Sequence, residues 1–251
     1  MSELQGLVAL VTGAARNIGR CIAVDLARGG ARIVVNARGS QAQAEETALL
    51  VCQAGGEALV HLADVTDPGA VAGLVEAAVG RFGGLDILVN NAAVRRETAF
   101  TALEPAEWRE VLGVILDGAY LCSRAALPHL QRSGTASIVN IGGMSAHTGS
   151  PGRAHVVTAK AGLIGLTRAL AHELSPEGIT VNCVVPGLID TVRAASSTSG
   201  GQPALHRAHK TLVGRRGRPD EIAAAVRYLC GPGARYVTGQ TLHVNGGAFL
   251  P

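Results

Sequence analysis

Seven short apolar runs are spaced along the chain, and each has the length of a buried β-strand. They are LVALV (7–11), ARIVV (31–35), ALVHL (58–62), LDILV (85–89), ASIVNI (136–141), ITVNCV (179–184) and QTLHV (240–244). The runs are continuous rather than alternating, which is typical of parallel strands covered by helices on both faces. The intervening segments have helical spacing, and the one at 18–30 ends in a glycine pair suited to a helix C-cap. The pattern predicts an α/β fold, a Rossmann-type doubly wound parallel sheet whose ligands bind at the carboxyl ends of the strands.

Length and composition narrow the classes of protein. The 251 residues suit a single domain spanning 1–251, and the 33 glycines allow helices to pack closely on a sheet. The net charge of +3 comes from scattered basic residues, so we expect no nucleic-acid and no membrane partner. The five cysteines are far apart, which predicts reduced thiols, no metal site and a cytoplasmic location. We expect no secretion signal in the acidic N-terminus MSELQG, and no apolar run reaches the roughly 18 residues of a membrane span.

One stretch of low complexity, AASSTSGGQPA at 194–204, interrupts the pattern of strands and helices. It is small, polar and too short to link two domains. We interpret it as part of a mobile lid over a small-molecule site, with 194–218 as the full extent of the lid.

The turn after the first apolar run, TGAARNIGR at 12–20, has the glycine spacing of a pyrophosphate site. Gly13 permits a tight turn, Gly19 permits close packing of the next helix, and the helix N-terminus presents N–H groups to phosphate. Asn17 stands where a third glycine is usual, and asparagine tolerates left-handed backbone. Two glycines also fit an ordinary strand-to-helix turn, so this motif alone does not decide the function.

Five further stretches occur in a recognisable order: ADV (63–65), LDILVNNAA (85–93), Lys160 with the small-residue helix that follows it, VNCVVPGLIDT (181–191) and the segment 214–247. With the glycine turn, they resemble the short-chain dehydrogenase/reductase superfamily, and within it the 3-oxoacyl-ACP-reductase-like members. The resemblance extends from residue 6 to residue 248.

The resemblance implies a site for a nicotinamide dinucleotide. It places Asp64 and Val65 at the adenine ring and Lys160 at the hydroxyls of the nicotinamide ribose. The implied cofactor-binding residues are Thr12, Gly13, Arg16, Asn17, Ile18, Gly19, Arg38, Asp64, Val65, Asn90, Ala92, Lys160, Pro186, Gly187, Ile189 and Thr191.

The end of the second strand indicates which dinucleotide is bound. Enzymes that prefer NADH place a carboxylate there to accept hydrogen bonds from the ribose diol. This chain has Ala37 at that position, followed by Arg38, and Arg16 lies near the same corner. Two guanidinium groups without a carboxylate suit a 2′-phosphate, so we predict NADP(H), with NADPH preferred over NADH.

The catalytic groups that the family resemblance implies are mostly replaced. The family uses a Tyr four residues before the Lys, a Ser thirteen before that Tyr, and an Asn in the preceding long helix. Here these positions hold Val156, Gly143 and Ile115, and no Tyr anywhere precedes a Lys by four residues. A positioned acid and an oxyanion donor each contribute roughly 10²–10⁴ in rate, so the standard mechanism is not expected.

Three functions stay open. The first is an atypical NADP(H)-dependent oxidoreductase for a small carbonyl, alcohol or imine, with Lys160, Ser145 or His147 as the catalytic acid or base. Nearby Arg95 and Arg96 would face the cleft mouth, where an arginine clamps a carboxylate or holds an enolate. The second is a lyase, hydratase or hydrolase on the same scaffold, and the third is a nucleotide-binding subunit without catalysis.

Apolar helices also indicate an assembly. The helix expected at 117–131 and the one starting near Thr158 are rich in Ala, Leu and Gly, with more apolar surface than one sheet face covers. We therefore predict a homotetramer or a homodimer built on these helices, as the family resemblance also implies.

Overall fold

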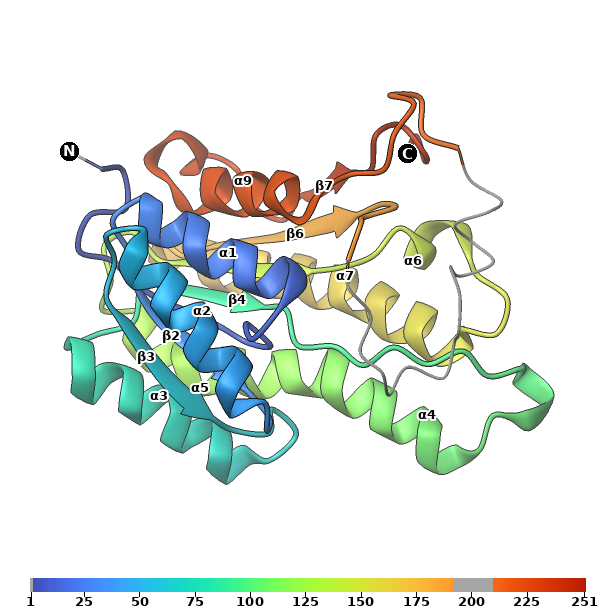
Figure 1. The fold of residues 1–251 in the computed structure, drawn as a ribbon, viewed down its shortest axis with the longest axis horizontal. Coiled ribbons are helices and arrows are strands. Elements are labelled where there is room, and N and C mark those ends of the chain that lie inside the picture. Colours follow the sequence, from blue (N-terminus) through green and yellow to red (C-terminus); the bar gives the residue numbers. More distant parts are fainter. Residues whose placement is uncertain (1, 192–209) are drawn as a thin grey trace.

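A central parallel sheet with helices on both faces forms the molecule (Figure 1). The computed structural model describes residues 2–191 and 210–251. The strand order is β3-β2-β1-β4-β5-β6-β7, and every pairing is parallel. The strands are β1 (Val8–Val11), β2 (Arg32–Ala37), β3 (Ala58–Leu62), β4 (Ile87–Asn90), β5 (Ser137–Ile141), β6 (Thr180–Pro186) and β7 (Thr241–Val244). The predicted Rossmann-type fold is confirmed.

One group of helices covers each face of the sheet. They are α1 (Asn17–Arg28), α2 (Gln41–Gln53), α3 (Pro68–Phe82), α4 (Pro105–Leu112), α5 (Gly118–Leu130), α6 (Ser145–Thr148), α7 (Ala154–Leu174) and α9 (Pro219–Cys230). Side chains of α1, α2 and α9 form one core with the sheet, and those of α3, α5 and α7 form the other. Neighbouring residues of β1 enter different cores, Ala9 the first and Leu10 the second, because successive strand side chains point to opposite faces.

All seven strands occur where the apolar runs predict them, with ends shifted by at most two residues. The helix expected near Thr158 begins earlier, at Ala154. The β-branched residues Val156, Val157 and Thr158 are weak helix formers, which conceals the start of α7 in the sequence. One consequence is that Val156 and Lys160 lie one helical turn apart on a buried face of α7.

The topology opens a crevice above β1. The chain leaves β1 toward β2 on one side, and later returns to place β4 on the other side of β1. Crossovers that diverge in this way leave a gap at the carboxyl ends of the strands, which is where doubly wound sheets bind ligands. Of the predicted lid, residues up to 209 lie outside the described residues, whereas Gly217 forms a bridge with Ile189 just past β6.

One continuous helical run, Pro105–Leu130, joins α4, a π-helical turn (Gly113–Asp117) and α5. By length and composition alone it is apolar enough to cross a membrane, but 44% of its most apolar window is buried inside the molecule. A core helix of a soluble protein has the same properties. The predicted assembly into a homodimer or homotetramer through this region stays a prediction.

Candidate active site

The turn between β1 and α1 has the backbone that its sequence predicts. Gly13 has φ +61°, and Asn17, at φ +51°, is the only non-glycine residue with positive φ among the described residues. A Cβ on Gly19 would lie 2.4 Å from the Gly13 carbonyl oxygen, so only glycine fits there. The first residues of α1 and its N–H groups therefore form an open cradle of the kind that holds a pyrophosphate.

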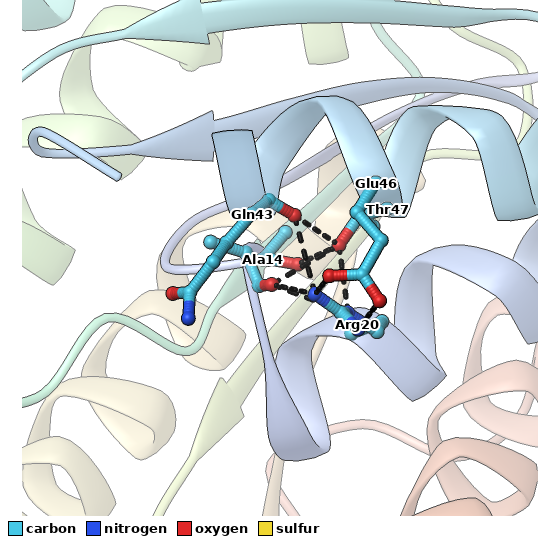
Figure 2. Close-up of polar contacts among 6 residues, drawn as sticks. Ala14, Arg20, Gln43, Glu46 and Thr47 are labelled. Carbon is cyan, nitrogen blue, oxygen red and sulfur yellow. Dashed lines mark hydrogen bonds and ion pairs between the residues drawn. The ribbon is translucent and has the colours of Figure 1, made fainter. Parts of the chain in front are cut away.

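Polar contacts from α2 hold this turn from behind (Figure 2). Thr47, fully buried, donates from its hydroxyl toward the carbonyl oxygens of Ala14 and Ala15 at 3.1 and 3.2 Å. Arg20 donates to the Ala15 carbonyl at 2.7 Å through Nη2 and forms an ion pair with Glu46 at 2.7 Å. The carbonyl groups of Ala14 and Ala15 are thus satisfied inside the protein. The first N–H groups of α1 have no acceptor within the helix and are the groups that a phosphate would use.

We expect Thr47→Val to destabilise the protein by about 1–2 kcal/mol, because the valine keeps the shape but leaves the carbonyls of the turn with one donor fewer. Urea unfolding followed by circular dichroism measures the change. Thr158→Val, at an exposed position of α7, is the matched control and should change the free energy of unfolding by less than about 0.5 kcal/mol. Equal effects in the two variants would contradict the assigned role of Thr47.

Two asparagines fasten the turn to the neighbouring strands. The Asn91 amide donates to the carbonyl oxygens of Thr12 and Gly13 at 2.8 and 3.0 Å. Asn36, at the end of β2, accepts from the Gly13 N–H at 3.4 Å and donates to Ala63 at 3.1 Å. Neither asparagine was predicted from the sequence, although Asn91 adjoins Asn90 in the motif NNAA.

A cleft with a volume of about 570 Å³ runs from the glycine turn to Lys160. Most of the predicted cofactor residues line it, namely Gly13, Arg16, Asn17, Ile18, Gly19, Arg38, Asp64, Val65, Ala92, Lys160, Pro186, Gly187, Ile189 and Thr191. Thr12 and Asn90 do not. The Thr12 hydroxyl accepts from the N–H groups of Asn91 and Ala92, at 2.9 and 3.0 Å. Asn90 donates to Asn140 at 2.9 Å inside the core, so these two residues act behind the cleft wall.

The end of the cleft near β2 is positively charged at its rim. Arg38 follows the last residue of β2 and lies 4.0 Å from Asp64, and Arg16 lines the same cleft. Hydrogen bonds from the backbone and side chain of Thr66 lower the pKa of Asp64, and Arg38 lowers it further, so its carboxylate is ionised at neutral pH. The guanidinium group of Arg38 thus lies near the Asp64 carboxylate, and Arg16 adds a second positive charge to the cleft.

The opposite end contains the residues expected at the nicotinamide. A Cβ on Gly187 would lie 2.6 Å from the Asn245 backbone, so this close approach of β6 to the segment after β7 requires glycine. Thr191 accepts a hydrogen bond from Arg95 at 3.3 Å. Pro186 ends β6 at the cleft. The geometry fits a bound dinucleotide along the whole cleft.

Lys160 is buried at the base of this end, and its ammonium donates to the carbonyl of Ile141. Burial is the main cause that lowers the pKa of Lys160 to about 8. Cys183 opposes this shift, and the positive charges of Arg95 and Arg153 add smaller contributions to it. The amine therefore titrates near physiological pH and can donate or accept a proton there.

Apolar side chains stand near Lys160 at the positions where the family resemblance implies a tyrosine phenol and an asparagine amide. Val156 lines the cleft and packs in one cluster with Ile115, which lies in the π-helical turn. A Cβ on Gly143 would meet only Lys160, at 3.8 Å. None of these three side chains can donate or accept a proton.

The other two catalytic candidates lie in different surroundings. Ser145 is buried and lines the cleft. His147 does not line it; its ring lies 4.5 Å from that of His243 and 5.3 Å from that of Phe249. Burial lowers the pKa of His147, and Arg168 lowers it further, which favours the neutral imidazole. The structure thus brings Ser145 and Lys160 to one cleft and leaves His147 outside its wall.

A doubly wound parallel sheet with a glycine-rich cleft at its carboxyl edge is the architecture of dinucleotide-binding proteins. A sequence profile described as enoyl-(acyl carrier protein) reductase matches residues 13–248. The chain is 38% identical over 244 residues to the 3-oxoacyl-[acyl-carrier-protein] reductase FabG of Staphylococcus aureus, covering 96% of this chain and 98% of that one. It is 37% identical to FabG of Vibrio cholerae, covering 99% of each chain.

Solved structures give the same result. A short-chain dehydrogenase from Burkholderia cenocepacia in complex with NADP superposes with a TM-score of 0.90 at 36% identity, covering 98% of this chain and 99% of that chain. A Serratia marcescens short-chain dehydrogenase/reductase gives a TM-score of 0.89 at 36% identity, with the same coverage. The chain belongs to the short-chain dehydrogenase/reductase superfamily of NAD(P)-dependent oxidoreductases, and it is FabG-like.

Proposed function

We propose that this protein is a cytoplasmic NADP(H)-dependent oxidoreductase that acts on a small carbonyl, alcohol or imine by a non-standard acid–base arrangement. One observation carries the proposal: the cleft keeps its dinucleotide cradle and Lys160, while Val156, Gly143 and Ile115 replace the family's proton-handling groups. When bound, the dinucleotide supplies or accepts a hydride. The relatives support NADP, since the Burkholderia cenocepacia structure contains it.

The preference for NADPH over NADH rests on Arg16 and Arg38. Both line the cleft, and Arg38 directly follows the end of β2, where Ala37 offers no carboxylate to a ribose diol. A guanidinium group binds phosphate through two parallel hydrogen bonds. Asp64 lies close enough to attract Arg38 when no phosphate is present, so binding would exchange one anionic partner of Arg38 for another.

The proposed proton donor is Lys160. The Lys160 amine lines the cleft, whereas the hydroxyl of Ser145 is too weak an acid to donate a proton by itself. His147 does not line the cleft. An imine in its protonated iminium form is the substrate that fits best, because hydride addition to the cationic C=N bond gives a neutral amine and develops no oxyanion. A carbonyl would demand a proton from Lys160 in the same step. Neutral imidazole and serine can only assist such a transfer.

Fluorescence titration of NADPH and NADH, followed by absorbance assays with a panel of ketones and imines, tests this proposal. We expect tighter binding of NADPH and measurable turnover of imines. Below a pH of about 8 the Lys160 ammonium is protonated, so kcat/KM for reduction should be constant there and fall as the pH rises above about 8.

Lys160→Met keeps most of the length of the side chain, which becomes one atom shorter, and removes the proton. This variant should have a kcat lower by roughly 10²–10⁴ and should lose the fall in kcat/KM at alkaline pH. If Lys160 only held the ribose, the substitution would instead change KM for NADPH. Tight NADPH binding without turnover of any substrate would contradict the proposal and favour a nucleotide-binding subunit. No dinucleotide binding would contradict it too and favour non-redox chemistry.

A further inference from the structure

The two lysines of the chain lie in different surroundings. Lys210 is exposed, whereas Lys160 is only 8% exposed and yet lines the cleft. A buried amine at the wall of a cleft can meet a small molecule there while most of its own side chain is shielded from water. Lys160 is therefore the lysine whose chemistry the fold alters, and Lys210 serves as an internal reference.

Little around Lys160 stabilises a positive charge on its amine. Within the part of the chain that the structure describes, this amine has a single hydrogen bond, to the carbonyl of Ile141, and no carboxylate pairs with it. Val156 and Ile115 are apolar, and Gly143 has no side chain. A neutral amine can still donate one N–H to the Ile141 carbonyl, which leaves its lone pair available to react.

The fraction of neutral amine at Lys160 is large for a lysine. Burial is the main cause that lowers its pKa to about 8. An ordinary lysine amine has a pKa of about 10.4, so roughly one in 250 such amines is neutral at pH 8, against about half of the Lys160 side chains. Because the neutral amine and not the ammonium attacks carbon, the fold supplies a nucleophile to the cleft.

We propose that Lys160, in protein without bound dinucleotide, captures a small aldehyde as a covalent imine. The amine nitrogen attacks the carbonyl carbon, so that a C–N bond forms and a proton passes from nitrogen to oxygen. The C–O bond of this carbinolamine then breaks, and the oxygen leaves as water with the second nitrogen proton while the C=N bond forms. One amine and one aldehyde thus give one imine and one water, with no oxidant or reductant. This activity goes beyond the proposed oxidoreductase function, in which the same side chain acts as an ammonium.

The space around Lys160 favours an unhindered, apolar aldehyde. A Cβ at Gly143 would meet only the Lys160 side chain, at 3.8 Å, so there is open space beside the lysine for a carbonyl group. Val156, one helical turn before Lys160, lines the same cleft and offers an apolar contact to a short alkyl chain. Butanal combines an unhindered carbonyl with such a chain and serves as the probe.

Reductive trapping followed by peptide mass spectrometry tests the proposal. Cyanoborohydride reduces the imine to a stable butyl amine, and the presence of only two lysines makes the site of each label unambiguous. At pH 8 we expect Lys160 to be labelled about tenfold or more faster than Lys210. Saturating NADP⁺ should slow labelling of Lys160 and leave that of Lys210 unchanged.

The pH profile of labelling has a worked-out sign. Neutral amine accumulates as the pH rises through about 8, so the labelling rate of Lys160 should increase up to that pH and level off above it. The proposed reduction has the opposite profile, since it uses the ammonium and falls above the same pH. The two activities of Lys160 are therefore distinguished by pH alone.

Gly143→Asp and Gly143→Asn form a matched pair of variants. The backbone at Gly143 is one that other residues adopt, and a carboxylate there would lie beside Lys160 and favour its ammonium. We expect Gly143→Asp to move the midpoint of the profile up by about one pH unit and to slow labelling at pH 7 about tenfold. Gly143→Asn, of the same size and without the charge, should change the rate by less than about twofold. Circular dichroism verifies that both variants are folded.

Labelling of Lys160 no faster than that of Lys210 would overturn the proposal, and so would a flat pH profile of the wild-type protein. Equal effects of Gly143→Asp and Gly143→Asn, or undiminished labelling with NADP⁺ bound, would also overturn it. Labelling without turnover of any ketone or imine would keep the capture of aldehydes and contradict the oxidoreductase function. Turnover without labelling would do the reverse.

Discussion

Gly19→Ala is expected to abolish useful dinucleotide binding, with an affinity loss of at least about 100-fold, or about 2.7 kcal/mol. The added methyl carbon would lie 2.4 Å from the Gly13 carbonyl oxygen and 2.5 Å from the Asn91 amide nitrogen. The turn cannot simply move aside, because Thr47 and Asn91 hold its carbonyl groups from two directions. Fluorescence titration of NADPH measures the loss.

Gly165→Ala is the matched control, since a Cβ there meets nothing within 4 Å in the interior of α7. It should leave NADPH affinity unchanged and stabilise the helix by roughly 0.5–1 kcal/mol. Circular dichroism distinguishes a local effect from unfolding of Gly19→Ala. A folded Gly19→Ala protein with wild-type affinity for NADPH would show that the ligand does not use this cradle.

The strands were predictable because burial on both faces leaves a continuous apolar run, a signal that needs no knowledge of distant contacts. The parallel, doubly wound character of the sheet followed from the alternation of strands with helices. The start of α7 was not predictable, since Val156, Val157 and Thr158 have low helix propensity and packing against Ile115 and Leu163 overrides it. Local preferences thus fixed the elements, and tertiary contacts decided their ends.

The residues of the candidate site also divide into those that local sequence predicts and those that only tertiary contacts place. Gly13, Gly19 and Arg38 lie in motifs that are contiguous in sequence, so their place in the cleft could be predicted. Thr47 could not, because it contacts the glycine turn only after α2 folds back across more than thirty residues, as its bond to Ala14 shows. His147 could be placed near the correct loop but not oriented, since its ring packs against His243 from β7.

The contact between the segment after β4 and the loop before α7 was equally hidden. Sequence proximity favoured Arg95 with Arg96 as a clamp, but the ion pair of Arg96 with Glu110 gives that arginine another role. Only the backbone bond between Thr98 and Gly152 reveals which segments lie side by side. Contacts between loops depend on the completed sheet and leave no periodic signal in the sequence.

Val156→Tyr is expected to raise the rate of ketone reduction by roughly 10²–10⁴, because a phenol one helical turn before Lys160 supplies the acid that the family positions there, in addition to Lys160. Val156 lines the cleft, so the ring has open space toward the substrate. Its packing against Ile115 should cost about 1–3 kcal/mol of stability. Steady-state assays with a neutral ketone and NADPH measure the gain, and adding Gly143→Ser should increase it, since a Cβ at Gly143 meets nothing nearer than 3.8 Å.

Val156→Phe introduces the same bulk without a proton and should give no gain. The comparison separates acid catalysis from a change in cleft shape, and the pH profile adds a second criterion, because a phenol beside the Lys160 ammonium has its own titration. If the Phe variant gained as much as the Tyr variant, the limit on the wild-type rate would be steric. If wild-type protein already reduced ketones as fast as Val156→Tyr, Lys160 or Ser145 would fully replace the phenol, and the preference for imines would be lost.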